Sequence, residues 1–406
     1  MKPPIRVAIV TGTRADFGLL RPTIEAMRAD ERFEPRVIAA AMHLSPAFGN
    51  TIEEIADAKI EVAARVETEP ESDQAGDFGR RIGMAVLGFT KELQRLDPDL
   101  LLVLGDRYEM LGAALAATGL EIPVAHVHGG ELSQGSLDDA MRHSITKLSH
   151  LHFVAARPYG ERVVQLGEQP ERVHVVGAAG IETIKMLELL ERDQLAERLG
   201  GIELAEPLAA VTFHPASLDP DSAGEQADQL ARAIAEAFAD RGTVIVTLPN
   251  DDPGNAAVRE RLLRLAEEQG NVHAFDSLGA VGYLSLLRSA DVVIGNSSSA
   301  ILEAPSFELP AVNVGERQRG RLTADNVISS EPEAGAISDA IAKALDPGFR
   351  KGLQGMESPF GDGEVSARIL EAIAAAPDAP ELRRKAFHDV EDSGGWREQL
   401  ELGGSS

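Results

Sequence analysis

The chain has 406 residues, 44% of them hydrophobic, which is enough to fill the cores of two domains. Its formal net charge of −26 argues against general binding to nucleic acid or to anionic membranes. It contains no cysteine, which excludes disulfides, thiolate metal ligands and a cysteine nucleophile.

In the first half of the chain, short apolar runs alternate with longer amphipathic stretches, which is the pattern of an α/β protein. The runs are almost wholly apolar, as in strands of a parallel sheet that is covered on both faces. Amphipathic segments at residues 19–29 and 110–118 predict helices between them. The predicted strands of this half are residues 6–10, 36–40, 100–104, 124–128 and 151–155.

The second half repeats this pattern without repeating the sequence. Helices are predicted at residues 225–239 and 257–269, and a helical segment near 181–199 leads into this half. The predicted strands are residues 209–212, 243–247, 272–275, 292–295 and 311–314. The sequence therefore predicts two doubly wound, Rossmann-like domains that face a cleft, with the loops after the strands turned toward it.

Composition sets the predicted domain boundaries. The stretches at residues 168–171 and 178–180 form the expected hinge, which gives an N-terminal domain of residues 1–177 and a C-terminal domain of residues 178–376. Residues 377–406 form a charged tail that contains Gly and Pro and ends in Gly-Gly-Ser-Ser, so we expect this tail to be disordered.

The sequence has no segment typical of membrane insertion or secretion. No apolar run reaches the about 18 residues that indicate a membrane span. Residues 1–4 lead directly into a β-type run, without the pattern of a signal peptide. Together with the absence of cysteine, these features predict a cytoplasmic protein.

Polar residues gather just after the predicted strands of the first half. The turn at residues 11–16 consists of small residues and opens a helix, so its Arg14 is placed to meet an anion; an ordinary strand–helix turn is the alternative. Asp106 and Arg107 follow a buried strand. An acid and a cation at one strand end favour a polar site over a purely structural ion pair.

The densest set of ionisable groups surrounds the fourth predicted strand. Strand alternation puts His126 and His128 on one side, which is compatible with a metal site. General acid–base chemistry is favoured instead, because imidazole and carboxylate groups around one substrate can have their pKa values tuned apart, so no metal is predicted. The set comprises His126, His128, Glu131, Asp138, Asp139, Arg142 and His143.

In the second half, residues 295–299 read Gly-Asn-Ser-Ser-Ser between a predicted strand and a helix. Hydroxyls and backbone N–H groups at a helix start form a site for phosphate, whereas simple capping needs only one serine. Glu303, one turn further, can accept hydrogen bonds from ribose hydroxyls or serve as an ordinary helix carboxylate. His214 follows another strand, and Arg317 begins a basic loop suited to an anion.

In their order, these motifs resemble those of the hydrolysing UDP-N-acetylglucosamine 2-epimerases of sialic and legionaminic acid biosynthesis. The resemblance runs from about Val7 to about Ile328. It implies a two-domain fold of the glycosyltransferase-B type, a UDP-sugar as the ligand, no cofactor, and a homo-oligomer that is expected to be a dimer. It also implies that the C-terminal domain holds most of the nucleotide.

The resemblance implies the following roles in nucleotide binding. Ser297 and Ser298 hold the diphosphate, and Glu303 holds the ribose. Leu278 and Tyr283 match the stretch that packs around the base. The other nucleotide and phosphate contacts are implied for Arg14, Arg107, His214, Asn250 and Arg317.

The same resemblance identifies candidate catalytic groups. Asp106, Glu131 and Asp138 match carboxylates that are catalytic or lie close to the catalytic groups. Position 128 is a departure, since some relatives carry a Glu there that is assigned to catalysis. The sequence therefore leaves open whether His128 or a carboxylate removes the C2 proton of the sugar.

The implied reaction is anti elimination of UDP across C1–C2 of UDP-N-acetylglucosamine, followed by addition of water to give free N-acetylmannosamine. Three alternatives stay open. The first is the same reaction on UDP-N,N′-diacetylbacillosamine of the legionaminic acid pathway, because the sequence does not indicate which residues recognise the C4 and C6 groups of the sugar. The second is a glycosyltransferase of the same fold. The third is a nucleotide-sugar sensor without turnover, against which the intact carboxylates argue.

Overall fold

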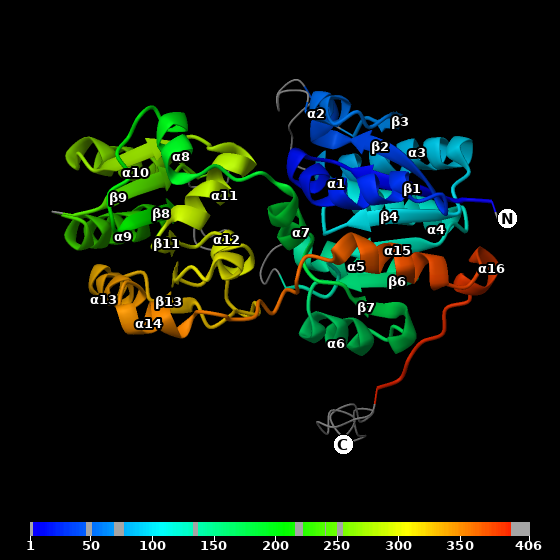
Figure 1. Ribbon diagram of the computed structural model, residues 1–406. Coiled ribbons are helices and arrows are strands. Elements are labelled where there is room, and N and C mark those ends of the chain that lie inside the picture. Colours follow the sequence, from blue (N-terminus) through cyan, green and yellow to red (C-terminus); the bar gives the residue numbers. More distant parts are fainter. Residues whose placement is uncertain are drawn as a thin grey trace, which may run out of the picture. The chain divides into compact units, whose positions relative to one another are not determined.

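A computed structural model describes residues 3–45, 51–68, 77–132, 137–215, 222–239, 241–249 and 255–390 (Figure 1). Contacts divide the described residues into two compact units. The first unit draws on Met1–Glu131, Ala140–Val176 and Ala367–Ser406, and the second on Leu132–Asp139 and Gly177–Ser366. Each unit has one sheet flanked by helices (Figure 1). None of the described helices is long and apolar enough to cross a lipid bilayer.

The sheet of the first unit has seven strands in the order β3-β2-β1-β4-β5-β6-β7, all paired in parallel. Its central strands are buried along their length, because helices cover both faces of a parallel sheet, and apart from His126 and His152 they are apolar. The strands are β1 (Ile5–Thr11), β2 (Phe33–Ala40), β3 (Val62–Val66), β4 (Leu100–Leu104), β5 (Val124–Val127), β6 (Leu151–Val154) and β7 (Val173–Val175).

Most helices of this unit connect successive parallel strands, whereas α15 and α16 follow the last strand of the chain. α1 begins where Thr13 accepts a hydrogen bond from the backbone N–H of Asp16, which is a typical N-cap. The longer helices are α1 (Arg14–Ala29), α3 (Asp77–Leu96), α4 (Tyr108–Gly119), α5 (Leu137–Leu148), α6 (Arg157–Gln165) and α15 (Val365–Ala375), and the short ones are η1 (Ala41–Leu44), α2 (Ile52–Asp57), η3 (Pro170–Arg172) and α16 (Ala379–Leu382).

The second unit contains a six-stranded parallel sheet in the order β10-β9-β8-β11-β12-β13. Its strands are β8 (Leu208–Thr212), β9 (Thr243–Thr247), β10 (Val272–Phe275), β11 (Val292–Gly295), β12 (Ala311–Val314) and β13 (Val327–Ser330). Its helices are α7 (Ala179–Met186), α8 (Arg192–Arg198), α9 (Ala223–Ala237), α10 (Asn255–Glu268), α11 (Gly279–Ser289), α12 (Ser299–Leu302), η5 (Ala304–Phe307), α13 (Ala334–Ala344) and α14 (Pro347–Gly352).

The strand order of each sheet determines where a ligand site is expected. In the first sheet the order reverses between β1 and β4, and in the second between β8 and β11. Loops at the carboxyl ends of such neighbouring strands diverge and leave room for a ligand. The motifs after β1, β4 and β5 therefore lie at one switch point, and those after β8 and β11 lie at the other.

The predicted fold class is confirmed, and all ten predicted strands are present. Sequence analysis missed β3, β7 and β13, which are short and partly exposed and so lack the apolar signal of a central strand. The helical segment predicted near residues 181–199 consists of two helices, α7 and α8. A capping box between Glu191 and Gln194 starts the second one.

The C-terminal region differs from its prediction. Residues from Ala367 onward group with the first unit rather than with the predicted C-terminal domain. Beyond residue 377 the chain forms α16, and Nζ of Lys385 then donates to the backbone oxygens of Lys147 and Ser149. The predicted disorder is therefore wrong up to residue 390, since this part of the tail satisfies carbonyl groups of the first unit. Residues 391–406 lie outside the described part of the chain.

Candidate active site

Arg142 joins the loops that follow two neighbouring strands of the first sheet. Its guanidinium forms an ion pair with Asp106, which follows β4. From Nη1 it donates to the backbone oxygen of His128, 2.8 Å away, just after β5. Nη1 also lies 3.8 Å from Oε2 of Glu131. Because the Arg142 side chain is only 7% exposed, one buried cation fixes the separation of these two loops.

His128 and Glu131 form the second charged contact of this cluster. Nδ1 of His128 lies 2.5 Å from Oε1 of Glu131, and both side chains are largely buried. His128 has a φ of 63°, in the left-handed region, and the next turn is possible only because Gly130 carries no Cβ to clash with the backbone oxygen of Tyr159. A carboxylate partner orients an imidazole and stabilises the imidazolium formed when the ring takes a proton.

Strand alternation had predicted that His126 and His128 lie on one side of the strand. This prediction is wrong. β5 ends at Val127, and the left-handed backbone of His128 breaks the alternation. His126 is wholly buried, with Nε2 2.7 Å from the backbone oxygen of Gly105. The two rings therefore have separate partners and do not converge.

Asp138, the third candidate carboxylate, lies in the first turn of α5 and is exposed. It precedes Arg142 by four residues, so the two side chains project from the same side of the helix. The three predicted carboxylates therefore come from the end of β4, from the turn after β5 and from the start of α5.

Arg14 and Arg107, the predicted cationic contacts of this unit, each have a carboxylate partner. Arg14 begins α1, is 70% exposed and lies 2.5 Å from Oε1 of Glu54. Nε of Arg107 lies 2.6 Å from Oε1 of Glu109, whose side chain is fully buried. A bound anion would share both guanidinium groups with these carboxylates.

Sequence analysis missed the role of Glu109. A Cβ at Gly12 would clash with the Glu109 carboxylate, so the glycine of the first motif makes room for this acid. Burial, together with the charge of Glu109, raises the pKa of Asp16 to about 6. The available signal was a glutamate inside α4, whose other residues are nearly all small or apolar.

In the second unit, Asn296 holds three loops together. Its side chain accepts from the backbone N–H of His214 and donates to the backbone oxygen of the same residue, both at 2.8 Å. The backbone oxygen of Asn296 accepts from Gln318 at 2.8 Å and from Arg317 at 3.2 Å. This brings His214 and Arg317, two of the predicted contacts, to the serine motif. Neither Asn296 nor Gln318 had been singled out, because amides in loops give no periodic signal.

The three serines of the motif have different surroundings. Ser299 is buried, and its Oγ lies 2.5 Å from the hydroxyl of Tyr283. Ser297 and Ser298 are half-buried, and Oγ of Ser297 accepts weakly from the backbone N–H of Ser299 at 3.4 Å. The expected helix start is short, since α12 has only four residues. A phosphate here would depend on hydroxyls and local N–H groups more than on a helix dipole.

Glu303 is the C-cap residue of α12, and its carboxyl group is buried. Its Oε2 is buried with no hydrogen-bond partner among the described residues. Burial raises the pKa of this carboxyl to about 7. Leu278 is buried at the start of α11, the helix that also carries Tyr283. Asn250, another predicted contact, lies outside the described residues.

Comparisons with known proteins identify the family of the chain. A family model described as UDP-N-acetylglucosamine 2-epimerase matches residues 25–374. The chain is 35% identical to a UDP-N,N′-diacetylbacillosamine 2-epimerase (hydrolyzing) of Legionella pneumophila, over 92% of this chain and 96% of that protein. It is 31% identical to a UDP-N-acetylglucosamine 2-epimerase of Neisseria meningitidis serogroup B, over 84% of this chain and 88% of the relative.

A solved structure supports the fold. The Neisseria meningitidis UDP-GlcNAc 2-epimerase bound to UDP-GlcNAc matches with a TM-score of 0.78 at 19% identity. The match covers 92% of this chain and all of that one. At this level of identity the likeness concerns the fold, which is of the glycosyltransferase-B type.

Proposed function

The chain belongs to the UDP-N-acetylglucosamine 2-epimerase family, and on that basis we propose that it is a hydrolysing 2-epimerase of UDP-linked 2-acetamido sugars. The observation that carries the proposal is the pairing of Asp106 with Arg142 and of His128 with Glu131 at the ends of β4 and β5. An elimination needs a base, a group that stabilises positive charge on the sugar, and a site for the departing anion. The chain has candidates for all three.

We assign the removal of the C2 proton to His128. The C2–H bond is weakly acidic, so its base needs a partner that orients it and stabilises the charge it gains. Glu131, 2.5 Å from Nδ1, is such a partner. Asp106 already shares its charge with Arg142, so it is better suited to stabilising positive charge on the sugar ring than to taking a proton. Asp138 is assigned to the orientation of water in the second step.

The nucleotide is assigned to the second unit. Ser297 and Ser298 bind the diphosphate together with Arg317, whose guanidinium already lies beside the serine motif. These groups stabilise the negative charge that grows on the β-phosphate as the C1–O bond breaks. Glu303 accepts hydrogen bonds from the ribose, which gives its buried oxygen the partner it lacks.

The remaining assigned contacts divide between the two units. Arg14 and Arg107 of the first unit and His214 of the second complete the phosphate contacts, together with Asn250. Leu278 and Tyr283 pack beside the base. To bind Arg14 and Arg107, the phosphate must compete with Glu54 and Glu109, respectively. We therefore expect these two arginines to be weaker phosphate contacts than Arg317.

The two proposed steps balance without a redox cofactor. In the first, the base takes the C2 proton, the C1–C2 double bond forms, and UDP leaves with the electron pair of the C1–O bond. In the second, water adds across the double bond. The hydroxyl group goes to C1, and C2 receives a proton on the face opposite to the one from which the first proton was removed. The net change is hydrolysis of the nucleotide sugar with inversion at C2.

The sugar is the open part of the proposal. UDP-N-acetylglucosamine, which would give N-acetylmannosamine, is the substrate implied by the sequence motifs. UDP-N,N′-diacetylbacillosamine is the second candidate, favoured by the higher identity to the Legionella pneumophila relative. The two sugars differ at C4 and C6, so the side chains around those positions decide between them.

A UDP-release assay with both nucleotide sugars tests the proposal. We expect UDP and the free 2-epimeric sugar in equal amounts from at least one substrate, and the ratio of kcat/KM values identifies the sugar. His128→Asn should lower kcat by about 10²–10⁴. His174→Asn, on another strand of the same sheet, is the matched control and should leave kcat unchanged.

The same assay separates the alternatives from one another. Release of UDP only when an acceptor is added would identify a glycosyltransferase. Binding of both nucleotide sugars without release of UDP would identify a sensor. The proposed homodimer is checked separately by measuring the mass of the protein in solution.

A further inference from the structure

His126 lies next to the loops that carry the charged pairs and is shielded from solvent. It belongs to β5 and has no exposed surface. Its Nε2 is 2.7 Å from the backbone oxygen of Gly105, the residue before Asp106. Its Nδ1 is 3.2 Å from Oγ1 of Thr146, which is equally buried and lies one turn after Arg142 on α5.

These two partners determine the protonation of the ring. A backbone oxygen can only accept, so the proton must be on Nε2. Nδ1 then accepts from the hydroxyl of Thr146. In a doubly protonated ring, Nδ1–H would instead have to donate to the Thr146 hydroxyl, and a positive charge would be buried. Burial lowers the pKa of His126 to about 3, so the ring is neutral at physiological pH.

The ring contacts both sides of the ion pair above it. Through Gly105 it holds the backbone that carries Asp106, and through Thr146 it holds the helix that carries Arg142. Gly105 is in the left-handed region with a φ of 79°, and its N–H donates to the backbone oxygen of Val127. Both backbone groups of Gly105 are thus bound to β5.

The turn after β5 packs against the same ring. A Cβ on Gly129 would lie 3.0 Å from Nδ1 of His126 and 3.1 Å from Oγ1 of Thr146, which is tight enough to force a shift. Since His128 directly precedes Gly129, the backbone next to His128 packs against His126.

We propose that His126 is a positioning residue for the chemical step, which sets Asp106 and Arg142 at their working separation through Gly105 and Thr146. This inference rests on the proposed function, because the step it serves is the elimination described above. His126 does not exchange a proton with the substrate. Its contribution is geometric, and displacement of a reacting group by about 1 Å can cost about 10²-fold in rate.

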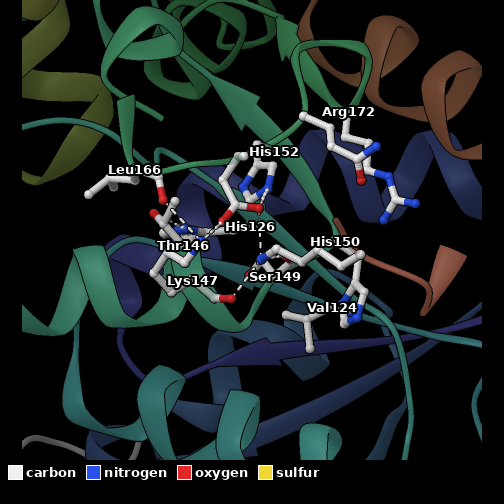
Figure 2. A network of polar contacts seen from close by, with 12 residues as sticks. Val124, His126, Thr146, Lys147, Ser149, His150, His152, Leu166 and Arg172 are labelled. Atoms are coloured by element: carbon white, nitrogen blue, oxygen red, sulfur yellow. Dashed lines mark hydrogen bonds and ion pairs between the residues drawn. The ribbon is translucent and has the colours of Figure 1, made fainter. Parts of the chain in front are cut away.

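A second buried histidine nearby has a different role. Nε2 of His152 lies 3.0 Å from Oε2 of Glu168, and the same carboxylate forms ion pairs with Nζ of Lys147 and of Lys385. Figure 2 shows His126 and Thr146 in one network with His152 and Lys147. The Glu168 part of this network attaches the residues near 385 to the rest of the first unit, and its partners within the described chain are Lys147, His152 and Lys385. His126 alone of the two histidines bonds a strand end that carries a candidate catalytic group.

Two amide variants of His126 separate the contacts of its two nitrogens. In His126→Gln the amide nitrogen can reach the position of Nε2 and donate to Gly105. In His126→Asn the amide reaches only the position of Nδ1, so the bond to Gly105 is lost. We expect kcat to fall by about 3- to 10-fold in the Gln variant and by about 10²-fold in the Asn variant, with KM changed less than about twofold in both.

Two readouts distinguish positioning from mere packing. The affinity for UDP, which is assigned to the second unit, should be unchanged in both variants, and the shape of the pH–kcat profile should be that of the wild type. His174→Gln, a partly buried histidine on β7, is the matched control and should keep the wild-type kcat. Equal kcat values per folded molecule in wild type, Gln and Asn variants would overturn the proposal. So would loss of one limb of the pH profile, since His126 would then be a titrating group.

A structural measurement covers the case in which the proposed function itself fails, that is, when the wild type releases UDP from neither nucleotide sugar. With ¹⁵N-labelled histidine and arginine, we expect a neutral Nε2–H tautomer for His126 from about pH 5 to about pH 8. The Arg142 guanidinium signals should shift in the Asn variant and not in the Gln variant. A ring that titrates near its usual value of about 6.5, or unshifted Arg142 signals, would contradict the positioning role.

Discussion

The loops at the two switch points are held together by different chemistry. In the first unit, the polar residues after the strands are charged and paired: Asp106 with Arg142, His128 with Glu131, and Arg107 with Glu109. In the second unit, the joining groups are mostly neutral: the amide of Asn296 and the hydroxyls of Tyr283 and Ser299. The guanidinium of Arg317 adds one cationic donor, to the backbone oxygen of Asn296. Near the serine motif of this unit, burial raises the pKa of the Glu303 carboxyl to about 7.

This difference is what a division of labour between the units would require. Charged pairs with short contacts hold a base and its counter-charges in a fixed geometry, which chemistry needs. A framework of neutral hydrogen bonds can receive an anion without first breaking an ion pair, which binding needs. Variants of the first unit should therefore change kcat, and variants of the second should change the affinity for the nucleotide.

The largest expected effect is that of Asp106→Asn. It keeps the size of the side chain but removes the charge that pairs with Arg142 and that the proposed mechanism places near the sugar, so kcat should fall by about 10²–10⁴. The affinity for UDP, measured by calorimetry, should stay within a factor of about 2. Asp97→Asn, at an exposed position, controls for the loss of a carboxylate. A variant of Asp106 that loses UDP binding and keeps its kcat would reverse the proposed roles of the units.

Asn296→Ala should have the next largest effect, and this effect should be on the affinity for UDP. The substitution removes both hydrogen bonds between the Asn296 side chain and the buried backbone of His214, at a cost of about 1–3 kcal/mol each. The serine loop should loosen, and the affinity for UDP should fall by about 10-fold or more. Thermal unfolding and calorimetry measure the two effects. An unchanged affinity with lowered stability would remove Asn296 from the binding framework.

Glu303→Gln should change the pH dependence of stability. The pKa of Glu303 is about 7 in the folded protein and near the ordinary 4.5 in the unfolded chain, so the folded state binds more protons between these values. Stability from this group is therefore highest below about pH 4.5 and declines, by about 3 kcal/mol, as the pH rises through about 7.

The comparison of Glu303→Gln with the wild type isolates that contribution. Melting temperatures at several pH values should converge toward low pH, if Gln and protonated Glu stabilise equally, and the variant should be the more stable one near pH 8. A constant difference between the two proteins across the range would contradict a raised pKa at this position. UDP should diminish the difference, because bound ribose supplies the missing partner.

The smallest expected effect on stability is that of Arg14→Gln. The pair with Glu54 is exposed, and such pairs contribute about 0–1 kcal/mol. If Arg14 also contacts the substrate, KM should rise several-fold while the melting temperature hardly changes. An unchanged KM would assign Arg14 to the surface pair alone.

The sequence predicted the framework of the molecule better than the contacts inside it. Buried strands such as β4 and β11 are uniformly apolar, so their positions and the polar motifs after them could be read directly. The bonds of Arg142 to Asp106 and of Asn296 to His214 join residues 36 and 82 positions apart, and no local pattern announces them. The edge strands and the structured part of the tail were not predicted for the same reason, because their structure depends on contacts with distant residues.

The most direct test of the account is a nuclear magnetic resonance time course of the protein with UDP-N-acetylglucosamine, and in parallel with UDP-N,N′-diacetylbacillosamine, in D₂O. The proposed elimination and addition predict release of UDP together with a free 2-epimeric sugar that carries deuterium at C2. Release of UDP with the C2 proton retained would contradict removal of that proton by His128 and would point to direct hydrolysis or transfer instead.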